Sequence, residues 1–367
     1  MMVNMVNIVN KIVNKMIKFP LWKDDGKSVV PLNEIQKRYI RIFLEKVENH
    51  KYNYVENKCL CGNNDESLDI LISEKDRYGI PCKIVLCKKC GLIRLKERLD
   101  DISTVEFYKN EYRGIYSGSE VASEVFFYDQ YKRGIIFLNL LKKHINLNEI
   151  RTVFEVGCGA GGILYVFKEI GKEVSGCDFG EKYLEYGKNK GLELYQGDLD
   201  PYKTLPNSQD LIILSHVMEH FNNPIELLNK ILQHVAPEKY LLIEVPGIFY
   251  IPKNYFNPIL YFQNAHVYNY YYYYLKVFFE ALGLKVIYGD ERCTFILKKP
   301  KNWQKQENIL IEDKELENWA KKVEYGLKKY KIIHILKLNP YYYKVGLVKI
   351  LDMLRLKNII KRLLRKS

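Results

Sequence analysis

Short apolar runs alternate with longer amphipathic stretches over residues 146–300. A run of four to eight apolar residues between turn signals predicts a buried strand, and apolar positions three and four apart predict a helix. Because the two patterns alternate, we expect an α/β fold with a mainly parallel, seven-stranded sheet and helices on both faces. The expected strands are Thr152–Val156, Glu173–Cys177, Glu193–Gln196, Leu211–Leu214, Tyr240–Val245, Lys285–Tyr288 and Thr294–Leu297.

The rest of the chain divides into four segments. Residues 1–55 read as helical, 56–98 hold two close cysteine pairs, 99–145 form a helical connector, and 301–367 form a basic helical tail. No run of about 18 apolar residues predicts a transmembrane helix. Polar residues recur every three or four positions from Met1 to Lys18, which predicts an amphipathic helix rather than a secretory signal. We therefore expect a cytoplasmic protein with reduced cysteines.

The net charge of +13 is concentrated in the tail. Residues 301–367 contain 17 Lys and Arg against seven Asp and Glu, so the body is nearly neutral and we do not expect a nucleic-acid partner. From Lys344 to Lys366 the spacing predicts a helix with one apolar and one cationic face. Such a helix would place the protein peripherally on an anionic membrane surface, at the inner face of the membrane. The alternative is that it packs on the protein's own sheet or on a second subunit.

A glycine-rich loop, Glu155-Val-Gly157-Cys158-Gly159-Ala-Gly161-Gly162, follows the first strand. Its glycines allow a tight turn and the close approach of a ligand, and the helix after it offers N-terminal amides. The spacing satisfies G-x-G-x-x-G, so a dinucleotide is an alternative ligand. In such sheets ligands bind beyond the carboxyl ends of the strands.

Three acidic residues at strand ends favour a different cofactor. Glu155 ends the first strand, Asp178 ends the second and can accept from both ribose hydroxyls, and Asp198 ends the third and can accept from an adenine amino group. In these positions the chain resembles the Rossmann-like class I S-adenosylmethionine-dependent methyltransferases over about 150 residues. A nicotinamide enzyme and a non-catalytic scaffold are the alternatives. The resemblance implies that S-adenosylmethionine is bound by Glu155, Gly157, Gly159, Gly161, Asp178, Asp198, Leu199 and Ser215.

Polar residues after the fourth and fifth strands are candidates for the reaction. Methyl transfer from a sulfonium needs mainly positioning, but an alcohol nucleophile also needs a proton acceptor. His220 and His266 are the candidate bases and Glu244 is a further catalytic candidate, although each can be structural. His216, Glu219, His220 and His266 can also hold a divalent metal, as Glu-His pairs do in some RNA-end and quinone methyltransferases of this fold.

Two cysteine pairs precede the sheet. Cys59-x-Cys61-Gly62 and Cys87-x-x-Cys90-Gly91 supply four thiolates, which fit one tetrahedral, structural zinc ion. The first pair is shorter than the usual C-x-x-C, so Cys82 can replace a ligand, and ordinary buried thiols are the alternative. The remaining cysteines, Cys158, Cys177 and Cys293, read as packing residues.

The order of these motifs narrows the resemblance. The cysteine pairs, then Cys90-Gly-Leu-Ile-Arg-Leu, Phe107-Tyr-Lys-Asn-Glu-Tyr and the cofactor domain, resemble methyltransferases of bacterial sugar and surface-polysaccharide pathways. In the sugar C-methyltransferases of that group a Glu-His pair stands where Ala265-His266 stands here. Because that carboxylate is missing, we expect O-methylation of a sugar hydroxyl on a nucleotide sugar or lipid-linked glycan. The alternative acceptor is an RNA base.

Overall fold

The computed structural model describes residues 17–197, 206–307, 309 and 311–338. The predicted C-terminal helix and most of the predicted N-terminal helix lie outside these residues, as do Asp198 and Leu199. Within the described part of the chain, no helix is both long and apolar enough to cross a membrane.

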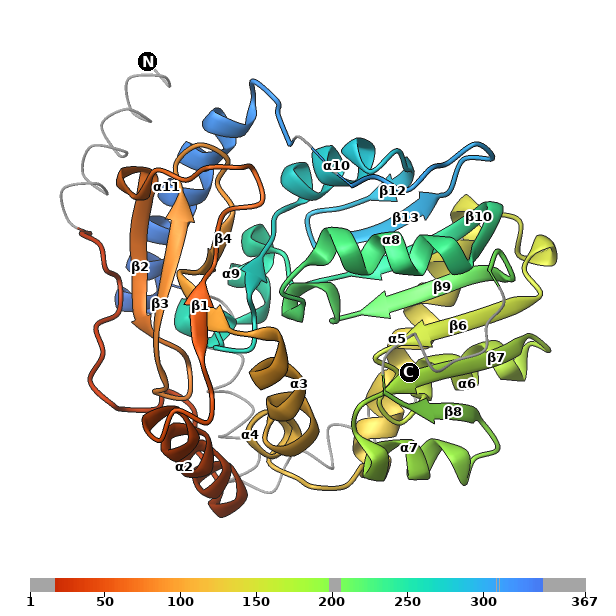
Figure 1. Cartoon of the computed structure of the whole chain (residues 1–367), viewed down its shortest axis with the longest axis horizontal. Helices are drawn as coiled ribbons and strands as arrows, with labels where there is room; N and C mark the ends of the chain where they lie inside the picture. The colour runs from red at the N-terminus through yellow and green to blue at the C-terminus, as the bar shows by residue number, and fades with distance from the viewer. Residues whose placement is uncertain (1–16, 198–205, 308, 310, 339–367) are drawn as a thin grey trace.

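A seven-stranded sheet runs in the order β12-β13-β10-β9-β6-β7-β8 (Figure 1). Five strands from β10 to β8 are parallel, and β13 pairs antiparallel with both β10 and β12. The α/β fold class predicted from the sequence is confirmed. The strands are β6 (Thr152–Val156), β7 (Glu173–Asp178), β8 (Glu193–Gln196), β9 (Gln209–Ser215), β10 (Val235–Glu244), β12 (Lys285–Gly289) and β13 (Thr294–Lys298).

Helices cover both faces of this sheet. Neighbouring residues of each strand point to opposite faces, so the sheet packs against helices on both sides. Val153 and Ile213 pack with α5, α6 and α7, whereas Phe154 and Ile212 pack with α8 and α10. Both faces are therefore apolar, as expected for a buried parallel sheet. The helices are α5 (Glu124–His144), α6 (Gly162–Glu169), α7 (Glu181–Lys188), α8 (Pro224–His234) and α10 (Tyr272–Ala281).

A second sheet, to the left in Figure 1, has the order β11-β4-β3-β2. Its strands are β2 (Asp69–Lys75), β3 (Pro81–Cys87), β4 (Ile93–Leu95) and β11 (Tyr268–Asn269). The last strand comes from the segment between β10 and α10, and it pairs antiparallel with β4. Residues far apart in the sequence therefore share this sheet, and its apolar side chains join the same core as one face of the large sheet.

Short elements connect the two sheets. Strand β1 (Tyr54–Glu56) pairs with β5 (Glu97–Leu99), and α3 (Asp101–Asn110) and α4 (Tyr112–Ser117) lead from there to α5. Residues 17–33 hold no helix; there Leu21 and Trp22 run along β2 instead. The other helices are α2 (Glu34–Glu48), α9 (Ile251–Asn254) and α11 (Leu316–Ile335), with 3₁₀ turns η1 (Glu66–Leu68), η2 (Leu147–Glu149), η3 (Met218–His220), η4 (Ile248–Tyr250) and η5 (Pro258–Tyr261).

Candidate active site and cysteine cluster

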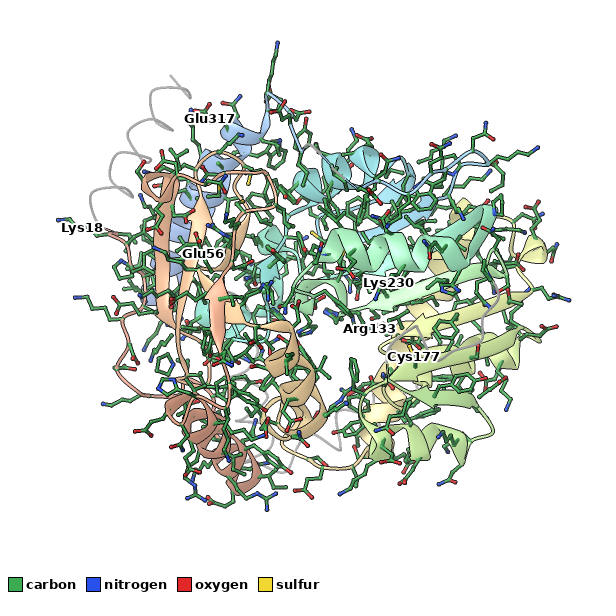
Figure 2. The ribbon with its side chains drawn as sticks, in the orientation of Figure 1. Lys18, Glu56, Arg133, Cys177, Lys230 and Glu317 are labelled. Atoms are coloured by element: carbon green, nitrogen blue, oxygen red, sulfur yellow. The ribbon has the colours of Figure 1, made fainter. Side chains whose placement is uncertain are left out.

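A cleft of about 1070 Å³ opens at the carboxyl ends of β6, β7, β9 and β10. Four of the predicted cofactor residues line it: Glu155, Gly157, Asp178 and Ser215. Its opposite wall comes from α3 and α4, and Arg133 and Lys230, labelled in Figure 2, are among its lining residues. The cleft therefore lies where ligands of open α/β sheets bind.

The glycine-rich loop between β6 and α6 turns sharply. Gly157, Gly159 and Gly161 all have positive φ angles, of 71°, 55° and 76°. A Cβ atom on Gly157 would lie 2.5 Å from Val217 Cγ2, so only glycine fits there. Gly159 and Gly161 do not line the cleft; they face α5 and Leu192 and shape the turn from behind.

Asp178 holds the loop and also faces the cleft. Its Oδ2 accepts from the Gly159 N–H (2.9 Å) and from Arg113 Nη2 (2.7 Å), and its Oδ1 accepts from the Gly180 N–H (2.7 Å). Arg113 comes from α4 and lies over the ring of Tyr183, 4.7 Å from its centroid. Sequence analysis missed Arg113, although a cation directly after the aromatic segment Phe107–Tyr112 is a recognisable signal.

Glu155 is buried at the end of β6, with 1% of its surface exposed. Its Oε2 atom has no hydrogen-bond partner among the described residues. Burial, together with the charge of Asp178, raises the pKa of this carboxyl well above its ordinary value. A ligand that supplies a donor or a positive charge would satisfy this oxygen, so the residue fits a cationic cofactor.

The reaction end of the cleft brings three predicted residues together. Glu219 and His220 lie on η3, and His266 lies just before β11. His220 Nε2 and His266 Nε2 are 3.8 and 3.9 Å from Glu219 Oε1, and the two rings are 4.9 Å apart. Burial lowers the pKa of both histidines, and the charges of His220 and Arg77 lower that of His266 further. Both imidazoles are therefore neutral near neutral pH.

Glu244 forms a separate network with Arg133, His216 and Thr294. Its carboxylate accepts from Arg133 and from Thr294 Oγ1 (2.8 Å), and His216 Nε2 lies 3.4 Å away. Burial opposes the charged form of Glu244, but the His216 contact and the Arg133 charge lower its pKa to about 2. Since so weak a base accepts protons poorly near neutral pH, Glu244 is better suited to orienting Arg133 and His216.

The four predicted zinc ligands converge between β1 and the β3–β4 turn. Sγ of Cys59 lies 3.5 Å from Sγ of both Cys61 and Cys90, and Sγ of Cys61 lies 3.9 Å from that of Cys87. Tetrahedral zinc with bonds of about 2.3 Å places its sulfur atoms about 3.8 Å apart. The arrangement fits such an ion, and Cys82 is not part of it.

The segment around His266, between β10 and β11, is hydrogen-bonded to the sheet β11-β4-β3-β2, which we call the cysteine sheet. The Leu95 N–H donates to the Val267 carbonyl (3.1 Å), and buried Asp76 accepts from the Asn264 N–H (3.0 Å). Tyr271 Oη also donates to the Cys90 carbonyl (2.6 Å). The cysteine sheet therefore positions one of the candidate catalytic histidines, which sequence analysis did not foresee.

The fold and the cleft are those expected of the methyltransferase domain that the sequence predicted, and a family model supports this prediction over part of the chain. Residues 128–288 match the model of a family described as "Methyltransferase domain". No curated protein matches the sequence.

Several solved structures are similar to the chain. One is an S-adenosylmethionine-dependent methyltransferase from Mesorhizobium loti (20% identity, 31% of this chain and 54% of that one, TM-score 0.27). Another, from Aquifex aeolicus, is also described as a SAM-dependent methyltransferase (20%, 44% and 87%, TM-score 0.34). A third is phosphoethanolamine N-methyltransferase 1 from Haemonchus contortus, in complex with phosphoethanolamine and S-adenosylhomocysteine (13%, 61% and 54%, TM-score 0.42). The chain spans about half the length of the first of these structures.

Proposed function

We propose that the protein transfers a methyl group from S-adenosylmethionine to a hydroxyl group of a nucleotide sugar or lipid-linked glycan. The observation that carries this proposal is that one cleft joins a cofactor end to a buried His-Glu cluster. The cofactor end is lined by Glu155, Gly157 and Asp178. The buried cluster consists of Glu219, His220 and His266, which line the same cleft. A hydroxyl nucleophile needs such a proton-accepting end, whereas positioning alone serves more reactive nucleophiles.

Residues at the two ends of the cleft have different roles in the proposed reaction. Asp178 accepts from one ribose hydroxyl, and the Gly157 backbone lets the cofactor approach the loop. The bound cofactor supplies an electrophilic methyl group. His220 and His266, both neutral because of burial, activate the acceptor hydroxyl opposite that group. Exclusion of water from the histidine end of the cleft by the bound acceptor would strengthen the electrostatic interactions that hold the acceptor in line with the methyl group.

The acceptor side of the cleft carries cations beside an aromatic ring. Lys253 and Arg292 lie 4.7 and 5.5 Å from the centroid of Tyr250, and all three residues line the cleft. Sugar acceptors that are linked to a nucleotide or a lipid carry a diphosphate, which such cations attract. This supports an activated sugar over a free one.

We also propose a structural zinc ion on Cys59, Cys61, Cys87 and Cys90. Four thiolates leave no open coordination position, so the ion would stabilise the fold and not take part in the reaction. It would fix the turn between β3 and β4, next to the strand that β11 joins.

The test is a screen by intact mass. Full-length protein is incubated with S-adenosylmethionine and with nucleotide sugars, lipid-linked glycans or RNA, and products are examined for the gain of one methyl group. The proposal expects methylation of a sugar acceptor, which Asp178→Ala reduces and Asp210→Ala, at the opposite end of the sheet, does not. Methylation of RNA and of no sugar would contradict the proposed acceptor.

A further inference from the structure

We propose that Glu219, His220 and His266 hold a divalent transition-metal ion at the reaction end of the cleft. This inference rests on the proposed function for its role but not for its existence. The three residues offer one carboxylate oxygen and two imidazole nitrogens that all lie within 4.8 Å of one another. They are 1%, 8% and 5% exposed, yet each lines the cleft.

Glu219 supplies the main observation. Neither of its carboxylate oxygens has a hydrogen-bond partner among the described residues, and both atoms are buried. A buried carboxylate without partners is costly, and native proteins usually satisfy such groups with a donor, a water or a cation. Here the nearest side-chain nitrogens belong to histidines that can act as ligands themselves: His216 Nδ1 at 3.4 Å, His220 Nε2 at 3.8 Å and His266 Nε2 at 3.9 Å.

His220 is oriented as a metal ligand. Its Nδ1 atom lies 2.9 Å from the Ala265 carbonyl, which only accepts, so the Nδ1–H donates to it. The lone pair of Nε2 then faces Glu219 Oε1 (3.8 Å) and the Tyr112 hydroxyl (3.5 Å), which would have to turn away for a metal to bind. Histidine ligands in metal sites typically donate their other N–H to a carbonyl or carboxylate in this way, which fixes both the tautomer and the ring.

His266 has a competing contact. The Gln263 amide nitrogen contacts its Nε2, and Arg77 Nη2 donates to Gln263 Oε1 (3.4 Å). Binding a metal therefore requires the Gln263 side chain to turn away from Nε2. His216 lies outside the three-residue group. Its Nε2 faces Arg133 and Glu244, and its Nδ1, although 3.4 Å from Glu219 Oε1, is not among the ligand atoms that converge.

The ligand set indicates the class of ion. One carboxylate and two imidazoles suit first-row transition metals such as Mn²⁺, Fe²⁺, Co²⁺ or Zn²⁺ better than Mg²⁺. Three protein ligands leave positions open toward the cleft, where the acceptor hydroxyl can bind. A metal lowers the pKa of a bound hydroxyl. With the metal bound, His220 and His266 activate the hydroxyl through the metal and not as bases. The hydroxyl proton then passes to solvent, the oxygen forms a bond to the methyl carbon, and the carbon–sulfur bond breaks with its electrons on sulfur.

The experiment titrates Co²⁺ into full-length protein purified with its cysteine site filled by zinc. Thiolate-bound Co²⁺ gives an intense near-ultraviolet band, whereas an oxygen–nitrogen site gives only weak visible bands. We expect the wild type to bind one equivalent of Co²⁺ at a site that gives only the weak visible bands. Glu219→Gln, which keeps the shape of the side chain, and His266→Ala should weaken its binding at least tenfold. Glu226→Gln, an exposed carboxylate lining the same cleft, is the matched control and should bind like the wild type.

Two results would overturn the proposal: no oxygen–nitrogen Co²⁺ site in the wild type, or unchanged affinity in a folded Glu219→Gln protein. If thermal melting shows that this variant does not fold, unchanged affinity in His266→Ala decides against the site. Calorimetry with S-adenosylhomocysteine separates this failure from that of the proposed function. Methyl transfer that persists in metal-free buffer would contradict the proposed role of the metal in the reaction and would leave the proposed methyl transfer intact.

Discussion

Replacing Asp178 tests the cofactor site directly. A carboxylate offers about four acceptor positions. Three are already used, by Gly159, Arg113 and Gly180. One ribose hydroxyl can therefore bind at the free position of Oδ1, while a second must displace Arg113 and gains little. The loss in Asp178→Ala should equal about one charge-assisted hydrogen bond, about 1.5–3 kcal/mol, or about 10- to 150-fold in Kd.

The assay is calorimetric titration of full-length protein with S-adenosylhomocysteine. Asp178→Asn keeps an acceptor oxygen and should lose less affinity than Asp178→Ala. Asp210→Ala is the control, because Asp210 lies at the start of β9 and accepts from the Arg151 and Thr152 N–H groups, away from the cleft. Wild-type affinity in a folded Asp178→Ala protein would refute the site, and NADH binding without S-adenosylhomocysteine binding would refute the cofactor.

Four further predictions concern the rest of the molecule. Metal analysis after purification without chelator should find about one thiolate-bound zinc per chain, which Cys87→Ser removes; a folded, metal-free protein would contradict this. His266→Ala should lower turnover about 10²-fold or more at unchanged cofactor affinity, and full activity in both it and His220→Ala would exclude these histidines. Because the pKa of Glu244 is lowered from 4.5 to about 2, its stabilisation is complete above pH 4.5 and is lost as the pH falls toward 2. Urea unfolding should therefore give Glu244→Gln a free energy of unfolding about 3 kcal/mol below that of the wild type at pH 7, and a smaller difference at pH 3. A difference that does not change with pH would contradict the assignment. Finally, full-length protein should sediment with anionic vesicles in a salt-sensitive way, at about 1 kcal/mol per basic residue, and a chain ending at Asn339 should not; equal sedimentation of both would count against the membrane helix.

Local patterns predicted the large sheet well. Most of its strands have an apolar run bounded by turn residues, and the starts of β6, β7 and β8 were predicted to the residue. The glycine loop and Asp178 were also predictable, because a tight turn and a strand end leave few residue choices.

What sequence analysis missed depends on contacts between distant segments. Strand β11 has only two residues, Tyr268 and Asn269, and no periodicity can show that they pair with Arg94 and Ile93. Arg113 reaches Asp178 only because α4 folds back over the cleft. That the Glu219 carboxylate oxygens find no hydrogen-bond partner among the described residues likewise depends on the folded surroundings of this side chain, which a sequence does not display.

The pairing of β4 with β11 has a consequence for synthesis on the ribosome. When β4 has emerged, its edge partner is still about 175 residues away along the chain. At 5–20 residues per second, the edge stays unpaired for roughly 10–35 s. During that time β4 exposes free backbone groups to which another nascent chain can pair. The strand that carries Ile93 and Leu95 is thus a place where a chaperone would help, because early filling of the cysteine site would hold β4 only against β3 and leave its β11 edge open.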